Sequence, residues 1–195
     1  MIETRASLIE RVRDPSDSVA WNEFVTIYQP LLTADVRKRG VGENDAADLV
    51  QMVLTRLLTA LTRFRLDHER GKFRTWLWQI THSTLTDWHR RRAVRTRAEQ
   101  GWIDQQGSPV ADLPDDDWEK LYRQRILEIV LKRASESAPA ASWECFNGRV
   151  LEDRPAAEIA AKLGISVNAV YINASRLLAR IREECAEYAE TLRGQ

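Results

Sequence analysis

The side chains best suited to chemistry in this chain lie between His82 and Arg97. Within that stretch an aromatic pair, Trp88-His89, is followed by five arginines: Arg90, Arg91, Arg92, Arg95 and Arg97. Arginines at this density neutralise phosphate groups, and neighbouring rings can stack on unpaired bases. The pattern favours nucleic-acid binding. The structural alternative is a solvated helix end whose cations complement the helix dipole.

Catalysis by the same stretch is a second hypothesis. His82, Asp87 and His89 would share one helix, and the two histidines are about two turns apart. The i, i+4 histidine spacing that holds zinc is absent, and no third ligand is evident. Cys145 and Cys185 lie far apart without a CxxC pair. The sequence therefore predicts no enzyme, no metal and no cofactor.

A second DNA-binding pattern lies near the C-terminus. Apolar residues at helical spacing predict a helix over Ala156–Leu163. Gly164 would end it, because only glycine enters a left-handed turn without steric cost. Ser166 would cap a second helix, whose inward positions are Val170, Ala174, Leu177 and Ile181. Two short helices joined in this way are typical of the helix-turn-helix. An ordinary helical hairpin is the alternative.

The elements that position these groups are all predicted to be helices. Apolar residues recur at helical spacing from about Ser18, over Asp45–Leu61, Phe73–Arg92 and Trp118–Ala134, and again after Pro139. Asn44 or Asp45 is the expected cap of the Asp45–Leu61 helix. No strand pattern of useful length is present. The sequence thus predicts an all-α fold.

Composition divides the chain into two modules. Residues 98–117 contain Gly101, Gly107, Pro109 and Pro114 and end in three aspartates, which favours a flexible acidic linker. We therefore expect two small helical domains, 1–97 and 118–195. The acidic run is expected to keep the tether soluble rather than to shield the arginines. The formal net charge is zero, and no apolar run is long enough to span a membrane. With no signal-peptide pattern, we expect a cytoplasmic protein.

Several motifs resemble a known family. Asp45-Ala46-Ala47-Asp48-Leu49-Val50-Gln51, Phe73-Arg74-Thr75-Trp76-Leu77 and Asp87-Trp88-His89-Arg90-Arg91-Arg92 are similar, in this order, to motifs of bacterial sigma-70 family factors of the extracytoplasmic-function (ECF) group. In the second module, Glu158-Ile159-Ala160 and Leu163-Gly164-Ile165-Ser166 continue the resemblance. It implies a sigma-2-like helical bundle over 1–97 and a sigma-4-like helix-turn-helix domain over 118–195.

The resemblance implies a polymerase-binding face on the Asp45–Leu61 helix. In the family this helix docks on the β′ clamp helices of core RNA polymerase. The matching residues here are Asp45, Asp48, Gln51, Met52 and Arg56. Met52 departs from the family, which often has glutamate at this place. N-terminal capping by the carboxylates is the structural alternative.

The resemblance also implies contacts with promoter DNA. Recognition and melting of the −10 element would involve Arg65, Asp67, Lys72, Arg74, Trp78, Ser83, Asp87, Arg90, Arg91 and Arg92. Trp76 is expected in the core beside Ile80. Many relatives have asparagine in place of Ser83. Recognition of the −35 element would involve outward residues of the second helix: Ser166, Asn168, Tyr171, Ile172, Asn173, Ser175 and Arg176.

The sequence-based hypothesis is an ECF-type sigma factor that binds core RNA polymerase and directs promoter-specific initiation. Its expected partners are the β′ clamp helices, the β flap and promoter DNA. Members of the group are often held by an anti-sigma protein, which makes such a partner a further expectation, although no residue here identifies one. The alternative is a polymerase-independent helix-turn-helix regulator, which would leave the motifs of the first module unexplained.

Overall fold

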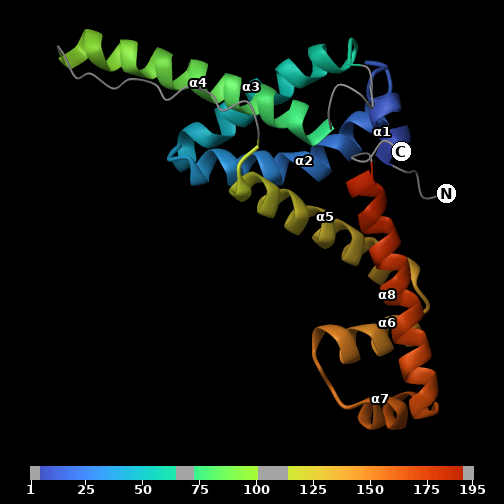
Figure 1. The fold of residues 1–195 in the computed structure, drawn as a ribbon. Helices are drawn as coiled ribbons and strands as arrows, with labels where there is room; N and C mark the ends of the chain where they lie inside the picture. Colours follow the sequence, from blue (N-terminus) through green and yellow to red (C-terminus); the bar gives the residue numbers. More distant parts are fainter. Residues whose placement is uncertain (1–4, 65–72, 101–113, 191–195) are drawn as a thin grey trace. The chain divides into compact units, whose positions relative to one another are not determined.

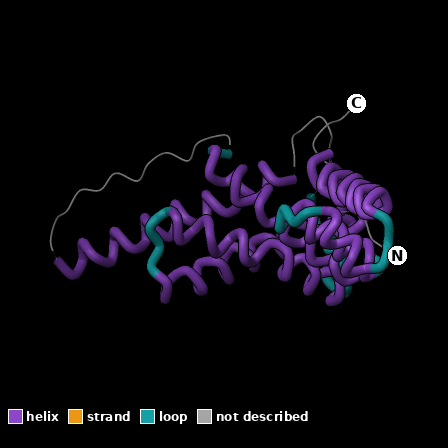
Figure 2. The backbone as a smooth tube through the Cα atoms, turned by 90° about the horizontal axis from the view of Figure 1, so that it is seen from below, coloured by secondary structure: helices purple, strands orange, loops and turns teal. Residues whose placement is uncertain are grey.

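The computed structural model describes residues 5–64, 73–100 and 114–190. In these ranges every regular element is a helix, and the all-α prediction is confirmed. Figure 2 shows these helices joined by loops. The chain forms two compact units, which divide inside one helix: residues up to Arg125 belong to unit 1 and Ile126–Glu190 form unit 2.

In the described residues, unit 1 contains four helices of its own and the start of a fifth. These are α1 (Arg5–Arg11), α2 (Ser18–Lys38), α3 (Glu43–Leu61), α4 (Phe73–Gln100) and the first turns of α5 (Asp116–Ser137). Figure 1 shows their arrangement. Sequence periodicity missed the short α1. It is joined to α2 through Asp17, which accepts the Ala20 N–H and receives the Arg11 guanidinium on both oxygens, at 2.8 and 3.0 Å.

Helix α3 presents one apolar face to the core of unit 1. Its buried positions repeat at helical spacing and are Ala46, Leu49, Val50, Val53, Leu54, Leu57 and Leu61. The prediction that Asn44 or Asp45 caps this helix is wrong. Gly42 is the N-cap and provides no side-chain bond, so Glu43 and Asp45 lie in the first turn, where carboxylates favour the helix dipole.

Helix α5 begins in unit 1, and three acidic residues at its start form ion pairs. Asp115 accepts the Trp118 N–H at 2.9 Å, which caps the helix, and the Trp118 side chain is fully buried. Asp115, Asp117 and Glu119 form ion pairs with Arg39, Lys38 and Arg74 respectively. These three carboxylates therefore have partners on unit 1, which the sequence did not predict.

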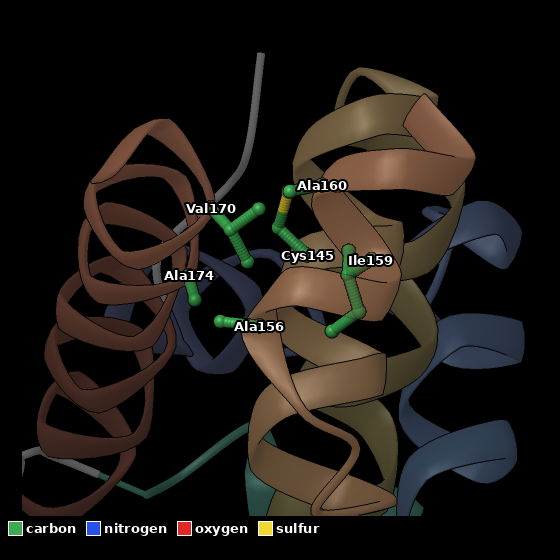
Figure 3. Close-up of a cluster of buried hydrophobic side chains, with 6 residues drawn as sticks. All are labelled: Cys145, Ala156, Ile159, Ala160, Val170 and Ala174. Carbon is green, nitrogen blue, oxygen red and sulfur yellow. The ribbon is translucent and has the colours of Figure 1, made fainter. Parts of the chain in front are cut away.

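Unit 2 contains the second part of α5 followed by α6 (Ala140–Phe146), a π-helical turn η1 (Asn147–Leu151), α7 (Ala156–Leu163) and α8 (Val167–Glu190). Figure 3 shows its small buried cluster, in which Val170 and Ala174 of α8 point toward α6 and α7. The other members of the cluster are Cys145, Ala156, Ile159 and Ala160. Alanines at these contacts let the helices approach closely.

The turn between α7 and α8 has the predicted construction. Gly164 adopts φ +65°, the left-handed conformation that ends α7, and Ser166 Oγ accepts the Ala169 N–H at 3.1 Å. The inward positions Val170, Ala174, Leu177 and Ile181 are all buried. These observations confirm the predicted helix–turn–helix arrangement.

A cluster of charges braces α7 from the other side. The Arg154 guanidinium binds Glu144 on α6 at 2.6 Å and Glu152 at 2.8 Å, and Lys162 on α7 binds Glu144 at 2.7 Å. Gly148 makes room for this cluster, because a Cβ there would lie 2.7 Å from an Arg154 nitrogen. The orientation of α7 is thus held by charge-assisted hydrogen bonds as well as by the apolar cluster.

Candidate nucleic-acid interface

The far end of α4 carries the arginine cluster on an exposed surface. Figure 1 shows this helix extending beyond the other helices of unit 1. Arg90 and Arg92 have side chains that are 73% and 57% exposed, and Arg91 is also exposed. The Arg92 guanidinium lies 5.1 Å from the centre of the Trp88 ring. The described part of this helix therefore offers several cations beside an aromatic surface, as phosphate and base contacts require.

Helices α3 and α4 are joined by ion pairs between residues predicted for two different functions. Arg56 on α3 donates to Asp87 on α4 at 2.8 Å and to the Thr84 hydroxyl at 3.1 Å. Asp45 on α3 pairs with Arg92. The hydrogen bond from Arg56 lowers the pKa of the Asp87 carboxyl. Arg56 and Asp87 thus hold the two helices together in addition to any external contact.

The outward face of α3 is the surface available to a partner. Asp48 and Gln51 are exposed, and Met52 is half-buried. Leu58, an apolar residue of the same helix, is 36% exposed. Asp48, Gln51, Thr55 and Leu58 recur at intervals of three or four and therefore share one face. Leu58 lies seven residues, about two helical turns, after the polar Gln51. This spacing could have predicted from the sequence that Leu58 is exposed.

The residues predicted for −10 contacts differ in exposure, and three of them lie outside the described residues. These three are Arg65, Asp67 and Lys72. Arg74 is only 15% exposed and pairs with Glu119 at 2.9 Å. Its pKa is lowered, chiefly by burial. Ser83 is exposed, and its hydroxyl donates to the Ile80 carbonyl at 3.0 Å.

The prediction for Trp78 is wrong. It was predicted to contact DNA, yet it is 1% exposed and its ring stacks on His82 at 4.2 Å between centres. Its burial follows from the packing of α4, which faces α3 through Thr84 and α2 through His82, so that more than one narrow stripe is covered. Trp76, expected in the core beside Ile80, is half-buried and packs on Phe64 at 4.4 Å and Phe73 at 5.5 Å.

The start of α8 presents a mixed polar and apolar surface. Tyr171 is 52% and Ile172 41% exposed, and Asn168, Ser175 and Arg176 are exposed around them. The Arg149 guanidinium lies 5.8 Å from the Tyr171 ring centre. Asn173 was expected to face outward. It is half-buried and hydrogen-bonds to the thiol of Cys145, whose pKa is raised, mainly by burial.

The three residues considered for catalysis point to different neighbours. His82 Nε2 lies 3.2 Å from Asp35 Oδ2 on α2, and Asp87 binds Arg56 on α3. His89 packs edge-on against Trp88, and its pKa is lowered by burial and by Arg92. Within residues 5–64, 73–100 and 114–190, no group of three or more His, Cys, Asp or Glu side chains has the arrangement of a metal site.

Part of the chain that carries these surfaces matches a known protein family. Residues 24–95 match the family model Sigma-70 region 2. This segment is similar to sigma-70 region 2. It runs from the second turn of α2 to the arginine cluster of α4 and includes the outward face of α3. The matched segment therefore contains both the exposed α3 face and the exposed arginines described above.

Comparisons with curated proteins and with solved structures add no evidence about function. The search of curated proteins found no match. Among solved structures, "Structure of CnrH in complex with the cytosolic domain of CnrY" is 22% identical, covers 91% of this chain and 94% of that chain, and has a TM-score of 0.37. A likeness this low carries no argument about function. In the described part of the chain, no helix has both the length and the apolar character needed to cross a membrane.

Proposed function

We propose that the chain is a sigma factor of the ECF type, which binds core RNA polymerase and directs promoter-specific initiation. The observation that supports this most is the sigma-70 region 2 match over 24–95. The exposure of Asp48 and Gln51 on α3 and of the arginines 90–92 on α4 adds to it. The chain has no catalytic role of its own in this proposal.

The two exposed surfaces of the matched segment would have separate roles. Asp48 and Gln51, with Leu58 as an added candidate, would contact the β′ clamp helices. The cations Arg90, Arg91 and Arg92 would neutralise DNA phosphates beside the −10 element. Asp45, Met52, Arg56, Ser83 and Asp87 remain proposed members of these sites.

Unit 2 would recognise the −35 element as a sigma-4 domain. The helix α8 would enter the major groove with its first turns, where Asn168 and Arg176 can pair with base edges. Tyr171 and Ile172 would add apolar contacts, of the kind that a thymine methyl group accepts. The β flap of the polymerase is the other proposed partner of this unit.

The proposal is tested by two measurements on the purified chain. One is its affinity for bacterial core polymerase freed of sigma factors, and the other is run-off transcription by the resulting complex on genomic fragments. Saturable binding with new, specific start sites is the expected result. Specific DNA binding by the chain alone, without polymerase binding, would instead support the stand-alone helix-turn-helix regulator.

A further inference from the structure

The first turns of α5 cover part of the segment that matches sigma-70 region 2, and Arg74 lies under them. Trp118 and Tyr122, one turn apart, are 0% and 2% exposed. Arg125 donates to the backbone carbonyls of Ile27 at 3.1 Å and Thr26 at 2.8 Å on α2. Figure 1 shows these turns alongside α2. The contact is a packed surface and not a loose approach of two charged segments.

Acidic residues of α5 pair with cations from two helices of unit 1. Asp115 binds Arg39 at 2.6 Å, and Asp117 binds Lys38 at 2.7 Å, both at the end of α2. Glu119 binds Arg74 at the start of α4 at 2.9 Å. The side chains of Arg74 and Glu119 are 15% and 18% exposed, so solvent screens this pair less than a surface pair.

We propose that the Asp115–Arg125 segment is an intramolecular cover that withholds Arg74 from DNA in the free chain. Glu119 occupies Arg74 with a carboxylate, an anion that a DNA phosphate would have to replace. The buried Trp118 side chain holds the segment against unit 1. This inference rests on the proposed function, because it takes Arg74 to be a −10 contact once the polymerase complex forms.

The test measures binding of the free full-length chain to a fluorescein-labelled pool of random 12-nucleotide single strands, as a function of salt. Glu119→Gln removes the charge and keeps the shape. It should raise affinity about fivefold near 0.1 M salt and steepen the salt slope by about 0.7, the increment for one more phosphate contact on a single strand. Asp116→Asn is the matched control, because Asp116 is an exposed member of the same acidic run.

Arg74→Ala makes the test specific. Combined with E119Q it should remove the gain in affinity and in salt slope. Equal effects of E119Q and D116N, or a gain that persists without Arg74, would overturn the proposal. Thermal melts of every variant ensure that folded proteins are compared.

Hydrogen exchange gives a second measurement that needs no substitution. Amides in 118–125 should exchange faster when the unmodified chain is saturated with the same DNA pool, because the cover must leave Arg74. Unchanged exchange in that segment at saturation contradicts the cover. Neither result affects the proposed sigma activity, which the polymerase-binding and run-off experiments test separately.

Discussion

Single residues of this chain show how far periodicity goes. The inward residues of α8, Val170 and Ala174 among them, were predicted correctly because only one face of that helix meets α6 and α7. Trp78 was not, because α4 is covered by more than one neighbour and its buried arc is wide. A sequence shows which face of a helix is apolar, but it does not show how many neighbours will cover that helix.

Arg56 provides a prediction at this scale. It bridges α3 to Asp87 and Thr84 on α4, with both charged side chains over a third exposed. Arg56→Met should therefore destabilise the protein by only about 1 kcal/mol, measured by urea unfolding. Asp87→Asn should cost a similar amount, and the double variant little more than either, because both lose the same pair. Fully additive costs would show that the pair is not coupled.

At the scale of elements, the α7–α8 turn was predicted almost completely. Its determinants are local: a glycine in a left-handed conformation and a serine cap. The docking of α5 on unit 1 was missed, because its determinants are pairs between residues far apart in sequence, such as Arg39 and Asp115. The acidic run suggested a linker on composition alone, and composition carries no information about distant partners.

Gly164 provides the prediction for this element. Its φ of +65° is strained for a residue with a Cβ, and no atom lies within 4 Å of the position that a Cβ would occupy. Gly164→Ala should therefore lower the stability of unit 2 by about 1 kcal/mol through backbone strain alone. Gly164→Asn should cost less, because asparagine tolerates this conformation. Thermal melts of both variants measure the loss in stability. Equal losses for alanine and asparagine would attribute the cost to contacts of the added side chain and not to the backbone conformation.

At the scale of the whole molecule, the functions of the two exposed surfaces in the segment that matches sigma-70 region 2 should be separable. Replacing Arg90, Arg91 and Arg92 together by alanine should weaken promoter complexes and reduce their salt slope by about 0.7–0.9 for each lost phosphate contact. Core polymerase binding should survive, because these exposed side chains lie on α4, apart from the exposed residues of α3 that are proposed to bind polymerase. Loss of polymerase binding with an unchanged slope would contradict the backbone role.

Changes on the outer face of α3 should do the reverse. Asp48→Ala and Gln51→Ala remove exposed side chains and no core contact, so stability should change by less than about 0.5 kcal/mol. Affinity for core polymerase should fall first, and the salt slope of DNA binding should stay unchanged. Titration of labelled chain with core polymerase measures the first effect. A drop in DNA binding of the isolated chain would show that the two surfaces are not independent.

Acid should destabilise both units through the same kind of group. The pKa of Asp115 in unit 1 is lowered by the Trp118 N–H and by Arg39, although burial opposes the shift, and the pKa of Glu144 in unit 2 is lowered by Lys162 and Arg154. A carboxyl with a lowered folded-state pKa binds protons more weakly when folded than when unfolded. Its contribution is therefore complete above the ordinary values, 3.8 and 4.5, and is lost as pH falls through the folded values.

This sign leads to a comparison that distinguishes the units. Asp115→Asn and Glu144→Gln should each lower Tm at pH 7, because each removes the charge that its partners bind. Between pH 5 and pH 3, about the range in which such carboxyls take up protons, each variant should lose less Tm than the unmodified chain. The change should follow the transition of the unit that carries the substitution, since the two carboxyls lie in different units. Parallel Tm curves for variant and unmodified chain would show that these groups do not control the acid response.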